Sequence, residues 1–268
     1  PAPELWCDDG LARRYDGALN IVDLTEQGPV IKGTRMLPQL NGERAFMRFN
    51  AAQRHAAAIG IDAAALPGAI DRFDAVRAEY QALLALGPVL DVLDAGGRPE
   101  EPQTRHYIAH QIGTTHGAQA LLYLRHDRLQ EARRAAEQAL ALRVQTVAAD
   151  PRTATWRDQL MVDANTLAVV TLRLGDHAAA LAAARQSWEA ATQLAREHGP
   201  ESKWARSLVQ LAPQWGRALA RNGRPAEALP VLDSAQRHWD ALLARDPAQA
   251  DAARRAAWMR VEKARALD

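Results

Sequence analysis

The chain has 268 residues, enough to bury a large core, and its 33 basic and 32 acidic residues leave a formal net charge of +1. That balance argues against a general nucleic-acid-binding protein, which would carry a clear basic excess. The single cysteine, Cys7, excludes an intramolecular disulfide and a zinc site built on several cysteines. No stretch approaches the roughly 18 apolar residues of a membrane-spanning helix, so we expect no membrane insertion within this sequence.

Residues 1–42 are interrupted at short intervals by dipeptides that favour turns, among them Asp9-Gly10 and Asn41-Gly42. The apolar stretches between them are short, and residues 18–24 with residues 30–31 would suit a small hairpin or an extended segment. We therefore expect residues 1–42 to form an irregular N-terminal arm.

From Glu43 onward the apolar residues recur at helical spacing. Residues 43–59 and 69–93 are predicted helices, and together they indicate a helical hairpin over residues 43–95. The stretch Ala95–Pro102 contains two glycines and two prolines in eight residues, a composition that stops a helix. It marks the expected boundary with the third part of the chain, residues 103–268.

In this third part, similar residues recur every 48 positions. The recurring sets are Asp127, Gly175 and Gly223; Ala132, Ala180 and Ala228; and Arg125, Arg173 and Arg221. A fixed period of this size is typical of stacked helical repeats, in which each unit buries its apolar face only against its neighbours. The sequence therefore predicts an all-α helical-repeat fold.

Each repeat is predicted to consist of two helices joined by a tight turn. The expected helices are residues 105–124, 129–149, 154–174, 178–197, 203–221 and 225–244, followed by a last helix over residues 248–267. Gly175 and Gly223 suit the left-handed backbone that commonly ends a helix, whereas Asp127 tolerates it less well.

The third helix pair carries the clearest motif, with Trp215-Gly216, Leu219, Gly223, Ala228 and Ala235 in order. In that pattern, residues 105–267 resemble tetratricopeptide repeats, although the family's usual period is about 34 residues. The pattern is also similar to the elongated repeats appended to bacterial serine/threonine kinases and membrane sensors. The resemblance implies a right-handed superhelix that binds partners. It implies no kinase activity, because the glycine-rich loop and catalytic motifs of kinases are missing from the sequence.

Arg125, Arg173 and Arg221, which we call the arginine series, lie near the end of the first helix of each pair. The resemblance implies that these helices line the inner face of the array, where guanidinium groups would suit an acidic peptide, a carboxylate or a phosphate. Alternatively, each arginine satisfies the carbonyl groups at the end of its own helix. Further inner-face candidates by position are Thr114, Asn165, Gln210 and Arg217.

His106 and His110 lie one turn apart on a predicted helix and could share a metal ion. They lack the glutamate of the HExxH motif and an obvious third ligand, so hydrogen-bonded or solvated histidines are the preferred interpretation. We predict neither a metal nor a cofactor.

We expect a non-enzymatic module that binds a protein or peptide, with an acidic partner favoured. It would act as a sensor or scaffold in a bacterial signalling or envelope system; its location is left open, with the periplasm favoured over the cytoplasm. One alternative is an assembly scaffold that uses its convex or terminal surfaces. Another is a helical metal-dependent enzyme that uses His106 and His110.

Overall fold

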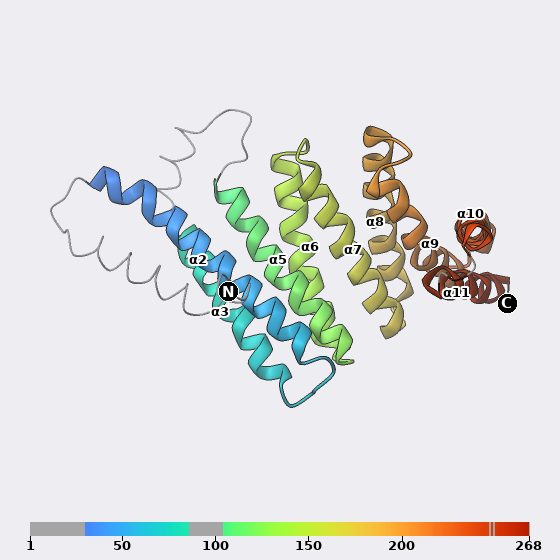
Figure 1. Cartoon of the computed structure of the whole chain (residues 1–268), viewed down its shortest axis with the longest axis horizontal. Coiled ribbons are helices and arrows are strands. Elements are labelled where there is room, and N and C mark those ends of the chain that lie inside the picture. The colour runs from blue at the N-terminus through green and yellow to red at the C-terminus, as the bar shows by residue number, and fades with distance from the viewer. Residues whose placement is uncertain (1–29, 86–103, 247, 249, 268) are drawn as a thin grey trace. The chain divides into compact units, whose positions relative to one another are not determined.

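The computed structural model describes residues 30–85, 104–246, 248 and 250–267, with side chains from Arg44 onward (Figure 1). All the regular structure in these ranges is α-helical, as the sequence predicted. The nine described helices are α2 (Val30–Ala58), α3 (Leu66–Leu84), α5 (Thr104–Arg125), α6 (Leu129–Ala149), α7 (Ala154–Leu174), α8 (His177–His198), α9 (Lys203–Arg221), α10 (Pro225–Arg245) and α11 (Ala250–Leu267). Among them, no helix is both long and apolar enough to cross a membrane.

The chain divides into two compact units, residues 1–150 and residues 151–268, here called unit 1 and unit 2. The division falls at Asp150, after α6, and the predicted boundary at Ala95–Pro102 lies outside the described residues. The physical reason is that α5 packs against α3, so the N-terminal hairpin and the first predicted repeat share one core.

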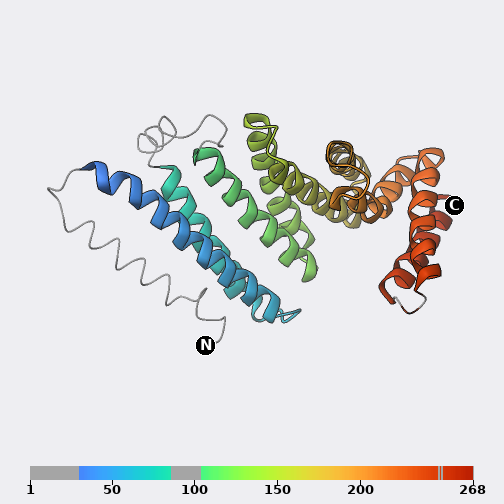
Figure 2. The ribbon, with the colours of Figure 1, turned by 45° about the horizontal axis from the view of Figure 1, so that its top comes forward.

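Unit 1 is built around the antiparallel pair of α2 and α3, with α5 packed on α3 and α6 on α5 (Figure 2). Its core joins aromatic and aliphatic side chains from three of these helices, including Phe49, Phe73, Tyr80, Ile108 and Leu122. These side chains are at most 6% exposed, which places the main hydrophobic stabilisation of the unit between α2, α3 and α5.

The helix α2 begins at Val30, thirteen residues before the expected start at Glu43. The expectation of an irregular arm is therefore wrong for residues 30–42, whereas residues 1–29 lie outside the described residues. Asn41-Gly42 falls inside the helix, because the packed segment from Ala45 to Ala56 already supplies a helical nucleus. Extension from a nucleus adds one hydrogen bond per residue, which outweighs a weak local turn preference.

Unit 2 consists of α7 to α11, and two of its hydrophobic clusters meet at α9. One cluster joins Met161, Ala191 and Leu211 from α7, α8 and α9. The other joins α9, α10 and α11 and includes Leu232 and Met259. Helix α9 therefore packs on both sides, and its end is held in a fixed relation to α7 and α11.

The turns that follow α5, α7 and α9 have the same backbone geometry. Asp127, Gly175 and Gly223 have φ values of 60°, 78° and 70°, so all three are left-handed. In each turn the next residue's N–H donates to a carbonyl five residues earlier, with N···O distances of 2.9, 3.0 and 3.0 Å. The prediction for both glycines is confirmed, and Asp127 adopts the same conformation. Each member of the arginine series lies two residues before such a turn.

Small residues allow the paired helices to approach closely. Ala132, Ala180 and Ala228 are completely buried near the start of α6, α8 and α10. At Gly216 a Cβ atom would lie 2.7 Å from the Leu232 side chain, so α9 and α10 pack with room for no more than glycine at this point.

Candidate anion-binding site

In unit 2, three helix ends and the start of a fourth helix line an open pocket of about 440 Å³. Its lining comes from α7, α8, α9 and α11. The lining residues are Leu172, Arg173, His177, Arg217, Arg221 and Arg265. Four of these six residues carry guanidinium groups and none is acidic, so the pocket can attract anions and can donate several charge-assisted hydrogen bonds.

Arg217 and Arg265 are held in place by one buried carboxylate, that of Glu262 on α11. Arg217 Nε donates to Glu262 Oε2 at 2.8 Å, and Arg217 Nη2 donates to Oε1. The same Oε1 also accepts from Arg265 Nη1 and from Trp258 Nε1, each at 3.0 Å. The Glu262 side chain is only 1% exposed, so its hydrogen-bonding capacity is used inside the protein.

This arrangement keeps Glu262 ionised. Burial alone would raise the pKa of the Glu262 carboxyl group, but the hydrogen bond and charge of Arg217 bring it below its usual value. The hydrogen bond that Arg217 donates to Glu262 outweighs the effect of burial and raises the pKa of Arg217. The pair fixes the direction of the Arg217 fork, whose side chain remains 31% exposed at the pocket.

His177 contributes a polar atom to the same pocket. It is the first residue of α8, whose N-cap Asp176 accepts a hydrogen bond from Ala179 N. The His177 backbone carbonyl accepts from Asn222 Nδ2 at 2.8 Å, which ties the start of α8 to the turn after α9. Its ring Nδ1 is buried and has no hydrogen-bond partner within the described part of the protein. A bound ligand is one way to satisfy such an atom.

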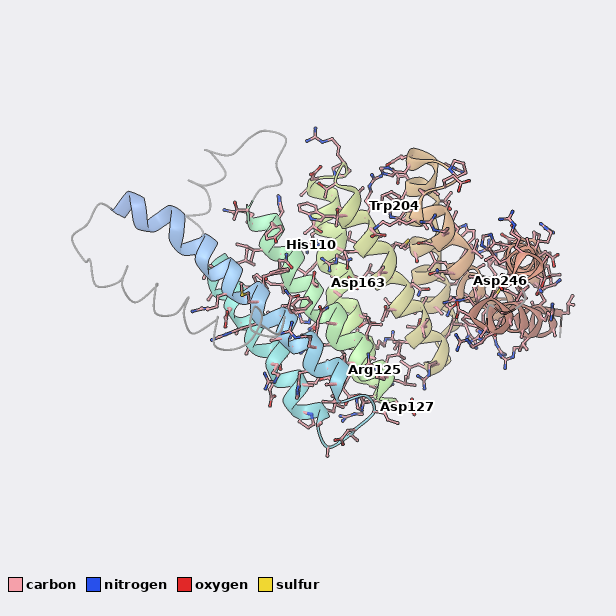
Figure 3. All side chains as sticks on the ribbon, viewed as in Figure 1. His110, Arg125, Asp127, Asp163, Trp204 and Asp246 are labelled. Carbon is pink, nitrogen blue, oxygen red and sulfur yellow. The ribbon has the colours of Figure 1, made fainter. Side chains whose placement is uncertain are left out.

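The arginine series is divided between the two units. Arg173 and Arg221 meet in the pocket, together with Arg217, which the sequence analysis also named. Arg125 lies in unit 1 (Figure 3), where its Nη1 donates to the carbonyl oxygen of Ala56 at 3.0 Å. Ala56 is in the last turn of α2, so Arg125 satisfies a carbonyl at the end of a neighbouring helix.

The remaining predicted site residues lie outside the pocket. Thr114, on α5, accepts a hydrogen bond from Arg143 Nη2 at 2.8 Å and donates to the His110 carbonyl at 3.0 Å. Asn165 is half-buried on α7, and Gln210 is exposed on α9. Thr114 therefore belongs to a polar cluster inside unit 1, and neither amide residue is among those that line the pocket.

His110 is part of that polar cluster. Its Nδ1 accepts from Arg143 Nη1 at 2.8 Å, and burial followed by the charge of Arg143 lowers the pKa of His110 to about 3. His106 is half-exposed on the same helix. Within the described ranges, no group of three or more His, Cys, Asp or Glu side chains is arranged to hold a metal ion.

Three polar contributors to the site were missed by the sequence analysis: Arg265, Glu262 and His177. Arg265 had a signal, since it lies 48 residues after Arg217 and continues the recurrence into the last helix. Glu262 lies one turn before Arg265, a spacing that helical ion pairs favour. His177 had no such signal, because its place in the pocket depends on how α8 begins beside α9.

No protein-family model matches the chain, and no curated protein matches it in sequence. Among solved structures, a de novo designed helical repeat protein aligns with 86% of this chain and 96% of its own, at 17% identity and a TM-score of 0.26. A superposition of that quality carries no weight, so the fold assignment rests on the helices described above.

Proposed function

We propose that this chain is a non-enzymatic binding module and that the arginine pocket of unit 2 holds an acidic segment of a partner protein. The observation that supports this most directly is the gathering of Arg173, Arg217, Arg221 and Arg265 around one pocket without an acidic lining residue. Planar guanidinium forks recognise carboxylate and phosphate groups in pairs of hydrogen bonds.

We further propose that the module is tetratricopeptide-like and serves a bacterial signalling or envelope system. The identical turn geometry after α5, α7 and α9 supports a common repeat unit, as do the buried alanines at equivalent positions. Arrays of this kind present extended surfaces for recognition and have stabilities that are approximately the sum over their repeats. A pocket formed by the ends of several helices is consistent with such a recognition surface.

The proposal is tested by fluorescence anisotropy with a labelled hexaglutamate peptide and a matched hexaglutamine peptide. We expect the wild-type protein to bind the glutamate peptide but not the glutamine peptide. The affinity for the glutamate peptide should fall as salt is added. The double variant Arg173→Ala/Arg221→Ala should lose at least about tenfold in affinity, since charge-assisted hydrogen bonds contribute about 1.5–3 kcal/mol each.

Arg125→Ala is the matched control, because Arg125 precedes the same left-handed turn but lies in unit 1. It should bind the peptide as the wild type does, and circular dichroism should show all variants equally helical. Equal affinity in the wild type and the double variant would mean that the pocket is not the binding site. Absence of binding to the wild type would contradict recognition of acidic segments altogether.

A further inference from the structure

The composition of the pocket favours a ligand group with two negative charges over a group with one. Four guanidinium groups line the pocket, none of the lining residues is acidic, and Glu262 lies behind Arg217 and Arg265. A second negative charge on the ligand therefore still meets an attractive potential, whereas a single carboxylate would leave that attraction unused.

The guanidinium groups come to the pocket from three different helices, an arrangement that suits a tetrahedral group. Arg173 comes from α7, Arg221 and Arg217 from α9, and Arg265 from α11. A planar carboxylate has two oxygens and is matched by a single fork. A phosphate monoester presents three terminal oxygens in different directions, so it can accept from several forks at once.

Two further observations fit a phosphate carried on a larger molecule. The buried Nδ1 of His177 has no partner in the described protein and can bond to a ligand, as donor or acceptor according to its tautomer. The pocket, at about 440 Å³, is of a size that accommodates a group together with its neighbours, and Leu172 supplies an apolar wall.

We propose that the acidic group recognised by this pocket is the phosphate monoester of a phosphorylated side chain on the partner protein. Arg173 and Arg221 are the binding residues, and Glu262 is the positioning residue that fixes Arg217 and Arg265. This inference rests on the proposed function and specifies its ligand.

The test compares phenyl phosphate with phenyl sulfate by isothermal titration calorimetry at constant ionic strength. The two compounds share a ring and a tetrahedral head group. Phenyl sulfate stays a monoanion, whereas the phosphate monoester gains its second charge with a pKa of about 6. At pH 7.5 we expect phenyl phosphate to bind about tenfold more tightly, and near pH 5 the difference should fall to about twofold.

The charged and titratable groups around the ligand are Arg173 on α7, His177 on α8, Arg217 and Arg221 on α9, and Arg265 with Glu262 on α11. The titration is repeated with His177→Gln as a control for the histidine at the pocket. The preference of the variant for phosphate at pH 7.5 should persist, because we assign it to the arginines.

Two peptides complete the experiment. They distinguish phosphate on a protein from free phosphate, and the phosphate inference from the proposed binding of acidic segments. A phosphoserine peptide should bind more tightly than inorganic phosphate and than the same peptide with glutamate in place of phosphoserine, and Arg221→Ala should remove the difference. Equal binding of phenyl phosphate and phenyl sulfate, or of the two peptides, would overturn the phosphate inference while leaving acidic-segment binding intact. A protein that binds none of these probes in an Arg221-dependent manner contradicts both.

Discussion

Arg143 in unit 1 and Arg217 in unit 2 each join two helices, but their surroundings differ. Arg143 is completely buried on α6 and donates to the ring and carbonyl of His110 and to Thr114 on α5. Arg217 pairs with the carboxylate of Glu262 and keeps part of its side chain open to a pocket. The comparison teaches that arginine stabilises the packing of unit 1, whereas unit 2 holds arginines at a surface where they can meet a ligand.

The largest effect on stability is expected from Arg143→Ala. It removes a large buried side chain and leaves the acceptors on His110 and Thr114 without their donor. We expect the free energy of unfolding of unit 1 to fall by about 3 kcal/mol. Urea denaturation checks this, with Arg221→Ala as the control, for which a change within about 0.5 kcal/mol is expected. Equal losses in both variants would contradict the conclusion that arginine has a different role in the two units.

Acidification should also affect unit 1 through its buried histidines. Burial, with the charge of Arg143, lowers the pKa of His110 to about 3, and burial, with Arg77, lowers that of His116 to about 4. Histidine in an unfolded chain titrates near 6.5, so between these values the unfolded chain binds protons that the folded unit does not. The stability is complete above about pH 6.5 and falls as the pH approaches about 4 and then 3.

Urea midpoints measured at pH 7.0, 5.5 and 4.0 test this dependence. His110→Gln should make the decline shallower, because it removes one of the two titrating groups. A decline of unchanged steepness in this variant would show that His110 contributes nothing to the acid sensitivity.

A smaller effect is expected at Gly216, where α9 meets α10 in unit 2. A Cβ atom at this position would lie 2.7 Å from Leu232, so Gly216→Ala should destabilise the unit by about 1–3 kcal/mol. The equivalent positions 96 and 48 residues earlier are occupied by Ala120 and Ala168, so the helices there pack with a methyl group present. The double variant with Leu232→Ala should lose less than the sum of the two single variants. Simple additivity would mean that the clash with Leu232 is not the cause.

A loss of stability smaller than that of Arg143→Ala is expected from Arg125→Ala. This change removes one hydrogen bond to the carbonyl of Ala56, at 3.0 Å, so a loss of about 1 kcal/mol is expected in unit 1. Paired binding measurements on Arg173→Ala should show reduced anion affinity, whereas Arg125→Ala should bind as the wild type does. If Arg125→Ala weakened anion binding as much as Arg173→Ala does, the proposed division of the arginine series would be wrong.

The sequence by itself determined the helices from Thr104 onward. Apolar spacing and the turn residues placed α6, α7 and α9 at their observed bounds and the other described helices of that region within two residues. It also predicted left-handed turns at Gly175 and Gly223. These features depend on local propensities and on periodicity, which a single sequence records directly. The same local rules failed for residues 30–42, where packing of the neighbouring segment extends the helix through turn-forming residues.

Only the tertiary structure decided what each arginine does. Arg125, Arg173 and Arg221 have the same place before the same turn, yet Arg125 meets the end of α2 while the other two meet Arg217 and Arg265 around a pocket. The role of a long, charged side chain depends on which helix lies beside it, and that neighbour can be far away in the sequence. Glu262 shows the same point, since 45 residues separate it from the arginine that it positions.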